Sequence, residues 1–117
     1  MLSCILKSKL HHLRVSSCAP EYQGSLLLDE DLMDMAGISN WEKILVANLE
    51  NGERFETYAI AGKRGSKVCC LNGAAACKGI KGDRLIIMTF AFMTEDERKA
   101  HVPNVVVFDE NNEPKRN

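Results

Sequence analysis

The stretch ILVANLENGERFETYAI, residues 44–60, indicates the fold class of this 117-residue chain. Apolar and β-branched residues dominate positions 44–49 and recur through positions 54–60, which favours two β-strands. Between them stands Asn51-Gly52, a pair typical of a tight hairpin turn because both central residues of that turn need a positive φ. The stretch therefore predicts an antiparallel hairpin.

Short strands are also predicted on both sides of this hairpin. The same patterns place them at residues 2–8, 11–17, 26–28, 67–71, 84–93 and 105–108. Three short helices are predicted: between Asp29 and Gly37, from the cap Asn72, and after Thr94, which forms a capping box with Glu97. Because strands and helices do not alternate regularly and no repeat is visible, we expect a small, mostly β barrel with helical inserts.

Length and charge exclude several classes of protein. A chain of 117 residues suits one domain, 1–117, and 15 basic against 16 acidic residues give no reason to expect a nucleic-acid partner. No apolar run approaches the roughly 18 residues of a membrane span, and the first residues lack the order of a signal peptide. We therefore expect a cytoplasmic protein without a membrane partner. Residues 110–117 carry no apolar anchor and are expected to be disordered.

The cysteines do not suggest a disulfide framework or a zinc site. Their number is odd, two of them are adjacent, and no C-x-x-C pair exists. We therefore expect small buried side chains in a reducing compartment, and no metal site. The five are Cys4, Cys18, Cys69, Cys70 and Cys77.

Four polar clusters could carry chemistry, although each has an ordinary structural reading. These readings are a solvated strand end, a turn, a solvent-facing strand and a capped helix start. The clusters are Lys9 with His11; Gly24-Ser25; Arg54 with Thr57 and Tyr58; and residues 72–75.

Taken together, the clusters carry a resemblance that runs from Lys9 to Phe108. The matching segments are K-L-H at 9–11, Y-Q-G-S at 22–25, N-G-E-R-F-E-T-Y-A-I at 51–60, R-G-S at 64–66, N-G-A-A-A at 72–76, G-D at 82–83 and P-N-V at 103–105. In this order they resemble the pyruvoyl-dependent aspartate 1-decarboxylases. The chain departs from that family at Ala47, where some members carry a large aromatic residue, and at Cys77.

The resemblance implies a fold and an assembly. Members of that family adopt a six- to seven-stranded double-psi β-barrel with short helices. They assemble as homotetramers with active sites between subunits. The predicted number of short strands is compatible with such a barrel.

The resemblance also implies a self-processing reaction. The Ser25 hydroxyl would attack the Gly24 carbonyl, and Thr57 would hold the developing negative charge. Glycine before the serine removes a Cβ and permits unusual backbone geometry. The products would be chains 1–24 and 25–117, with Ser25 converted to a covalent pyruvoyl group. This cofactor would form a Schiff base with L-aspartate and yield β-alanine and CO2, a step in pantothenate and coenzyme A biosynthesis.

Side-chain chemistry gives the remaining site residues their implied roles. Tyr58 would protonate the product carbanion, since an unperturbed phenol pKa of about 10 keeps it protonated at neutral pH. Arg54 and Lys9 would bind the two carboxylates of aspartate. The other substrate contacts would be His11, Thr57, Asn72 and the backbone N–H groups of Gly73, Ala74 and Ala75.

A regular strand places these residues on different faces. Arg54, Glu56 and Tyr58 would share one face and Thr57 would lie on the other, with about 13 Å between the Cα atoms of Arg54 and Tyr58. A bend in the strand, or a site shared between subunits, would be needed to bring them onto one small substrate.

Two other functions remain open from the sequence. An N-terminal nucleophile hydrolase would also be cut before Ser25, but it would keep the free amine of that serine. A non-enzymatic β-barrel binding module would leave the chain uncut.

Overall fold

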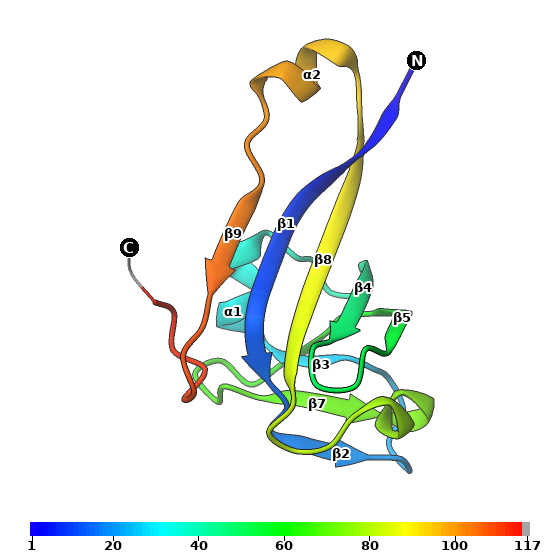
Figure 1. Ribbon diagram of the computed structural model, residues 1–117, viewed down its shortest axis with the longest axis vertical. Coiled ribbons are helices and arrows are strands. Elements are labelled where there is room, and N and C mark those ends of the chain that lie inside the picture. The colour runs from blue at the N-terminus through cyan, green and yellow to red at the C-terminus, as the bar shows by residue number, and fades with distance from the viewer. Residues whose placement is uncertain (116–117) are drawn as a thin grey trace.

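The computed structural model describes residues 1–115, which fold into two β-sheets with three short helices (Figure 1). The five-stranded sheet has the order β5-β4-β8-β1-β9 and the four-stranded sheet the order β2-β7-β3-β6. The first sheet contains β1 (Ser3–Arg14), β4 (Lys43–Asn48), β5 (Arg54–Tyr58), β8 (Arg84–Met93) and β9 (Asn104–Val107). The second contains β2 (Ser17–Ala19), β3 (Leu27–Asp29), β6 (Ile60–Gly62) and β7 (Cys69–Asn72). The helices are α1 (Glu30–Ala36), the 3₁₀ helix η1 (Gly73–Lys78) and α2 (Glu95–Ala100).

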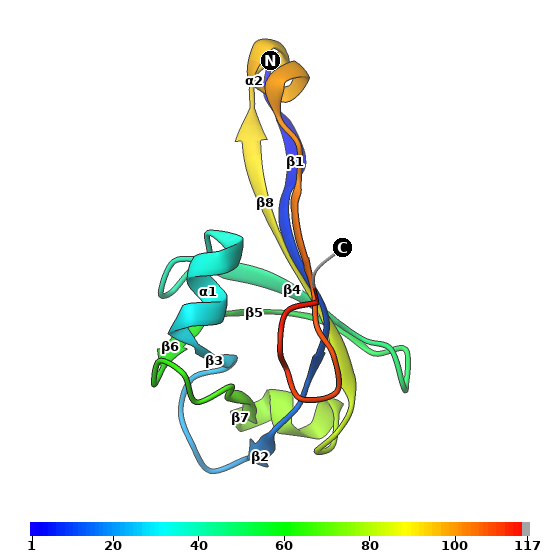
Figure 2. The same cartoon turned by 90° about the vertical axis from the view of Figure 1, so that its left-hand side faces the viewer.

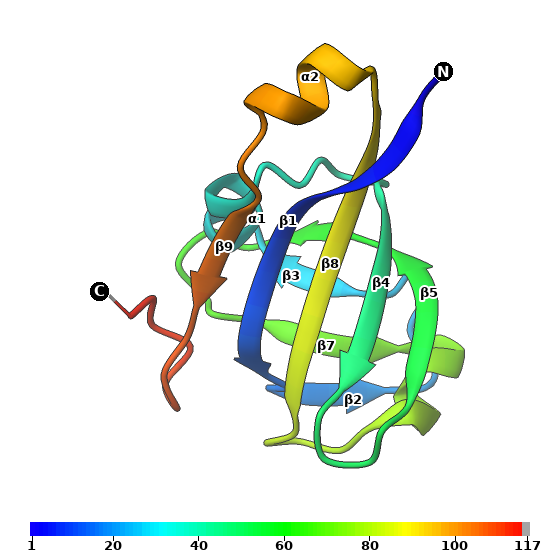
Figure 3. The ribbon, with the colours of Figure 1, turned by 45° about the horizontal axis from the view of Figure 1, so that its top comes forward.

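The core lies between the two sheets, whose strands cross one another in Figure 3. Leu10 of β1 and Ile87 of β8 face Leu28 of β3 and Leu71 of β7, and all four side chains are completely buried. The mainly β class is therefore confirmed. Residues 1–115 hold nine strands rather than six or seven, because the second sheet is built from very short strands.

One long strand, β1, replaces the two strands predicted for residues 2–8 and 11–17. It pairs antiparallel with β8 from Ser3↔Met93 to Arg14↔Arg84. The register shifts at Lys7 and again at His12, so two β-bulges absorb the extra residues without ending the strand. The start of β1 and the end of β8 project beyond the core, with α2 at the tip (Figures 1 and 2).

The predicted hairpin is confirmed, but its turn is longer than expected. β4 and β5 pair antiparallel from Lys43↔Tyr58 to Ala47↔Arg54. Gly52 takes a positive φ of 75° whereas Asn51 does not. The Asn51 side chain instead accepts the Glu53 N–H and donates to the Lys78 carbonyl, so the two-residue turn predicted from Asn51-Gly52 is wrong.

The segment expected to be disordered is ordered as far as the structure describes it. Asn112 is only 6% exposed, and its side chain accepts the backbone N–H of Arg14 and donates to the Arg14 carbonyl. The Asp109 carboxylate accepts two backbone N–H groups, those of Asn111 and Glu113. Polar anchoring thus replaces the missing apolar anchor for residues 110–115, while 116 and 117 lie outside the described residues.

No helix within residues 1–115 is long and apolar enough to cross a membrane.

Asp29 joins α1 to the loop that follows β6. Its carboxylate is fully buried and accepts N–H groups from Asp31 at 2.8 Å, Gly65 at 3.1 Å and Lys67 at 2.8 Å. We expect Asp29→Ala to lower the free energy of unfolding by about 3 kcal/mol, because it removes a helix cap and leaves three backbone N–H groups without their acceptor. Urea unfolding followed by circular dichroism measures the loss. The control Asp31→Ala removes an exposed carboxylate that pairs with Arg64, and should cost less than about 1 kcal/mol. Equal losses in the two variants would contradict this role of Asp29.

Candidate active site

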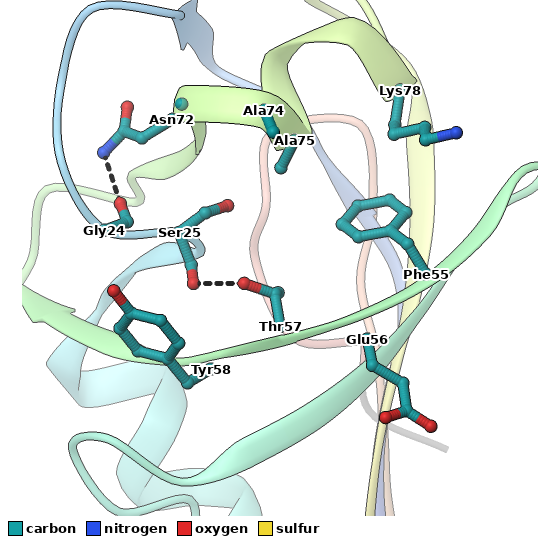
Figure 4. A pocket seen from close by; sticks show the side chains of 11 residues that line it. Gly24, Ser25, Phe55, Glu56, Thr57, Tyr58, Asn72, Ala74, Ala75 and Lys78 are labelled. Atoms are coloured by element: carbon teal, nitrogen blue, oxygen red, sulfur yellow. Dashed lines mark hydrogen bonds between the residues drawn. The ribbon is translucent and has the colours of Figure 1, made fainter.

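A cavity of about 320 Å³ lies between the edge strand β5, the segment around Ser25 and the helix η1 (Figure 4). Eight of the residues singled out from the sequence line it, although they come from three separate segments of the chain. The lining residues are Gly24, Ser25, Phe55, Glu56, Thr57, Tyr58, Asn72, Gly73, Ala74, Ala75 and Lys78.

Backbone hydrogen bonds hold the Ser25 segment against β5. The Tyr58 N–H donates to the Ser25 carbonyl at 3.2 Å, and the Ile60 N–H donates to the Leu26 carbonyl at 2.9 Å. The segment therefore continues the sheet beyond its edge strand. The cavity lies at this edge of the sheet, so side chains from both faces of β5 can reach it. Thr57 and Tyr58 point to opposite faces of the strand and both line the cavity.

The carbonyl of Gly24 has a side-chain donor. Asn72 Nδ2 donates to it at 2.9 Å, as the dashed line in Figure 4 shows. Gly24 has a φ of +82°, and a Cβ at this position would lie 3.3 Å from Ile60 Cγ1 and 3.8 Å from the Tyr58 hydroxyl oxygen. Both the backbone conformation and the limited space therefore favour glycine here.

The Ser25 hydroxyl is the unusual polar group of the cavity. Ser25 is 7% exposed, and within residues 1–115 its Oγ has no hydrogen-bond partner. Leaving a buried hydroxyl unpaired costs about 1–3 kcal/mol, so such groups are rare unless they serve a purpose. Here the hydroxyl is one residue from a carbonyl that Asn72 polarises. A nucleophile, an electrophile and a donor for the resulting negative charge therefore meet at one peptide bond.

Thr57 makes a different contact from the one that the resemblance implies. Its hydroxyl donates to the carbonyl of Ser25 at 2.6 Å, and the contact with the Gly24 carbonyl belongs to Asn72. Two donors, the Thr57 hydroxyl and the Tyr58 N–H, thus converge on the Ser25 carbonyl oxygen. In the uncut chain the donor to the Gly24 oxygen is therefore Asn72, and the role that the resemblance implies for Thr57 stays a prediction.

The Tyr58 side chain extends toward the Gly24–Ser25 segment (Figure 4). Its ring stacks on Trp41, with ring centroids 6.0 Å apart and an interplanar angle of 27°. The alternation predicted for β5 is confirmed, since Arg54, Glu56 and Tyr58 are exposed while Thr57 is half-buried. Trp41 was not predicted to lie here. It is the one tryptophan of the chain, but its position in a loop gave no sign of this contact.

Asn72 does not cap η1, contrary to the prediction from the Asn-Gly-Ala-Ala-Ala run. Its amide is held between two other groups: the nitrogen donates to the Gly24 carbonyl and the oxygen accepts from the Cys70 thiol. Gly73, Ala74 and Ala75 line the cavity and take up little of its space, while their contact with a substrate stays a prediction.

Lys9, His11 and Arg54 do not reach this cavity within one chain. They lie on the outer face of the five-stranded sheet, in neighbouring rows of its register. One row runs across four strands, from Arg54 of β5 through Ala47 of β4 and Ile86 of β8 to His11 of β1. Lys9 is opposite Met88, one row along. Three strand spacings, about 14 Å, separate Arg54 on β5 from Lys9 and His11 on β1. None of the three lines the cavity.

The environment of His11 favours its neutral form. Burial lowers its pKa most, and the positive charges of His12 and Lys9 lower it further. The ring stacks on His12 with centroids 4.0 Å apart. Within the described residues, its Nδ1 is buried without a hydrogen-bond partner. A neutral imidazole on this face can donate or accept a hydrogen bond but adds no charge.

Three lining residues were not predicted: Phe55, Glu56 and Lys78. Lys78 contributes a positive charge to the rim, but its ammonium lies 3.2 Å from a Glu53 carboxylate oxygen. Figure 4 shows Lys78 and Glu56 pointing away from Ser25. The position of Lys78 depends on the path of η1, which the alanine run alone did not specify.

Comparison with known proteins agrees with this arrangement. A family model described as aspartate decarboxylase matches residues 1–115. The aspartate 1-decarboxylase of Leptospira biflexa serovar Patoc is 49% identical over 117 residues, covering 99% of each chain. That of Chlorobium limicola is 53% identical over 112 residues, covering 96% of this chain and 88% of its own. That of Caldicellulosiruptor saccharolyticus is 50% identical over 112 residues, with the same coverage.

Proposed function

Because the chain belongs to the aspartate decarboxylase family, we propose that it converts L-aspartate to β-alanine and CO2, a step that serves pantothenate and coenzyme A biosynthesis. The observation that carries the proposal is the buried Ser25 hydroxyl, which has no partner among residues 1–115 and lies beside a Gly24 carbonyl that Asn72 polarises. This geometry suits a chain that makes its own cofactor at Ser25.

The first reaction is a cut between Gly24 and Ser25. Ser25 Oγ attacks the Gly24 carbonyl carbon, and the Asn72 N–H stabilises the charge that develops on the carbonyl oxygen. The amide C–N bond breaks, an ester forms, and the Ser25 nitrogen takes up the hydroxyl proton. Loss of the Ser25 α-proton then expels the Gly24 carboxylate, and water replaces the nitrogen, which leaves as ammonia. The products are chains 1–24 and 25–117, the second beginning with a pyruvoyl group.

The residues around Ser25 suit that group. When formed, it supplies an electrophilic ketone that binds the substrate amine and withdraws electrons as CO2 leaves. The Ser25 carbonyl, which would stand next to the ketone, receives hydrogen bonds from the Thr57 hydroxyl and the Tyr58 N–H. These two donors would hold the carbonyl in place and stabilise negative charge on its oxygen. The adjacent cavity of about 320 Å³ has room for a substrate as small as aspartate.

Within residues 1–115 of one copy, the cation that lines the cavity is Lys78, which is paired with Glu53, so the two substrate carboxylates need further cations. Arg54, Lys9 and His11 share the outer face of the five-stranded sheet, so a second copy could present them to this cavity. We therefore place each active site between two subunits of a homotetramer. Arg54 would bind one carboxylate with its planar fork and Lys9 would supply a point charge to the other. The N–H groups of residues 73–75 and His11 would complete the contacts.

Tyr58→Phe separates processing from turnover. The variant should still be cut, because Ser25, Gly24 and Asn72 are unchanged. Its kcat should fall by about 10²–10³-fold, because the phenol proton is lost from the cavity. The rate of β-alanine formation should be divided by the amount of pyruvoyl chain, measured by intact mass, so that incomplete cutting does not mimic slow chemistry. A wild-type kcat would remove Tyr58 from the role of proton donor.

The two alternative functions differ from this one in the mass of the chains. A non-enzymatic module would show the uncut chain, and an N-terminal nucleophile hydrolase would show a cut chain that begins with serine. The decarboxylase should show a long chain that is resistant to Edman degradation and trapped by borohydride in the presence of aspartate.

The five cysteines, all of them free, support a reducing compartment such as the cytoplasm.

A further inference from the structure

We propose that Cys70 is a positioning residue for the cut, acting through Asn72; this rests on the self-cleavage proposed above. The Cys70 thiol donates to Asn72 Oδ1 at 2.9 Å, and Asn72 Nδ2 donates to the Gly24 carbonyl at 2.9 Å. Cys70 is 5% exposed and Asn72 6% exposed. A buried chain of two hydrogen bonds therefore ends on the oxygen that must carry negative charge during the cut.

The two ends of an asparagine amide are not equivalent. Only the nitrogen can donate to the Gly24 carbonyl, and a half-turn of the amide would set two acceptor oxygens against each other. The Cys70 thiol favours the productive orientation, because it donates to the amide oxygen there and could only accept weakly from the nitrogen in the turned one. Without the thiol, that oxygen is left buried without this donor and the orientation of Asn72 is less well defined.

The backbone fixes this arrangement. Cys70 and Asn72 are two residues apart on β7, so their side chains lie on the same face of the strand. β7 is an inner strand of the four-stranded sheet, with Ser17 of β2 and Leu27 of β3 opposite Cys70 on its two sides. The thiol is therefore held where its hydrogen bond is needed.

Cys69 offers a matched control. It is the preceding residue of β7, it is completely buried, and its side chain lies on the opposite face, in the core. Cys69→Ala and Cys70→Ala remove the same atoms from neighbouring buried positions. A loss that came only from packing would be at least as large for Cys69→Ala.

The rate of the cut is the quantity to measure. Freshly synthesised full-length chain is incubated and sampled over time, and intact mass gives the fraction cut. We expect Cys70→Ala to slow the cut about tenfold, and Cys70→Ser to restore it because a hydroxyl donates in the same place. Asn72→Ala should slow it by about 10²-fold or more. The double variant should be no slower than Asn72→Ala alone, since Cys70 acts through Asn72.

The possible failures are distinct. If the wild-type chain is cut and Cys70→Ala is cut equally fast, the positioning role is overturned while the proposed function stands. The role is also overturned if Cys69→Ala slows the cut as much, or if the double variant shows the two losses multiplied. A wild-type chain that is never cut would overturn the proposed function and the role of Cys70 with it.

Discussion

The Ser25→Ala variant is expected to remain a single uncut chain of 117 residues and to form no detectable β-alanine. The substitution removes the nucleophile of the cut and the oxygen through which the Gly24 carboxylate would leave in the elimination, so no ketone can form. The fold should survive, because the Ser25 hydroxyl has no hydrogen-bond partner within residues 1–115 and its loss leaves no other group unpaired. Intact mass, circular dichroism and an assay for β-alanine measure the three expectations.

The control for this variant is Ser39→Ala, which removes a hydroxyl from an exposed loop away from the cavity. It should be cut and should turn over aspartate like the wild type. If Ser25→Ala formed β-alanine at a measurable rate, the cofactor would have to come from elsewhere and the proposed mechanism would be wrong. If it unfolded, the hydroxyl would have a structural role that the contacts do not show.

A mixed assembly of two inactive variants is expected to recover activity. Arg54→Ala alone should lower kcat/KM by about 10²-fold or more, because a buried substrate carboxylate loses its charged partner. Ser25→Ala alone is expected to be inactive. In tetramers coexpressed from both, some sites combine the intact Ser25 cavity of one copy with the intact Arg54 face of the other. At equal amounts and random assembly, about a quarter of the sites should be of this kind.

The matched control pairs two cavity variants, Ser25→Ala and Tyr58→Phe. Both changes affect the same copy's contribution to a site, so no mixture restores a complete cavity and activity should not rise above that of Tyr58→Phe. Recovery in the first mixture and none in the second would support sites shared between subunits. An absence of recovery in both would mean that Arg54 serves the cavity of its own copy or none.

The features predicted best from the sequence are the local ones, which depend on residues close together along the chain. The hairpin of β4 and β5, the helix between Asp29 and Gly37, and the capping box of Thr94 and Glu97 are all confirmed. Each depends on a turn residue, a cap or an alternation of side chains within a few positions.

The remaining features depended on contacts between distant segments. Asn72 has the residue type of a cap, but its amide oxygen accepts from the Cys70 thiol and its nitrogen donates to a carbonyl 48 residues away. The failure over residues 110–115 has the same origin, because Asn112 is held by Arg14, which is 98 residues earlier. The residue types of the candidate site were predictable, but their division between a cavity and a sheet face required the strand register.

The position of β1 has a consequence for the mature protein. A cut after Gly24 would leave β1 and β2 on a 24-residue peptide that shares no covalent bond with the rest. Yet β1 lies between β8 and β9, and β2 pairs with β7, so the peptide is part of both sheets. Its release would require both sheets to open, which makes dissociation and unfolding the same event. Folding of the precursor would be a unimolecular process, whereas refolding of the cut protein would be bimolecular and would become less favourable on dilution. The stability of the precursor would be set by its folding equilibrium. After the cut, the lifetime of the folded protein would depend on its unfolding rate, which is kinetic stability.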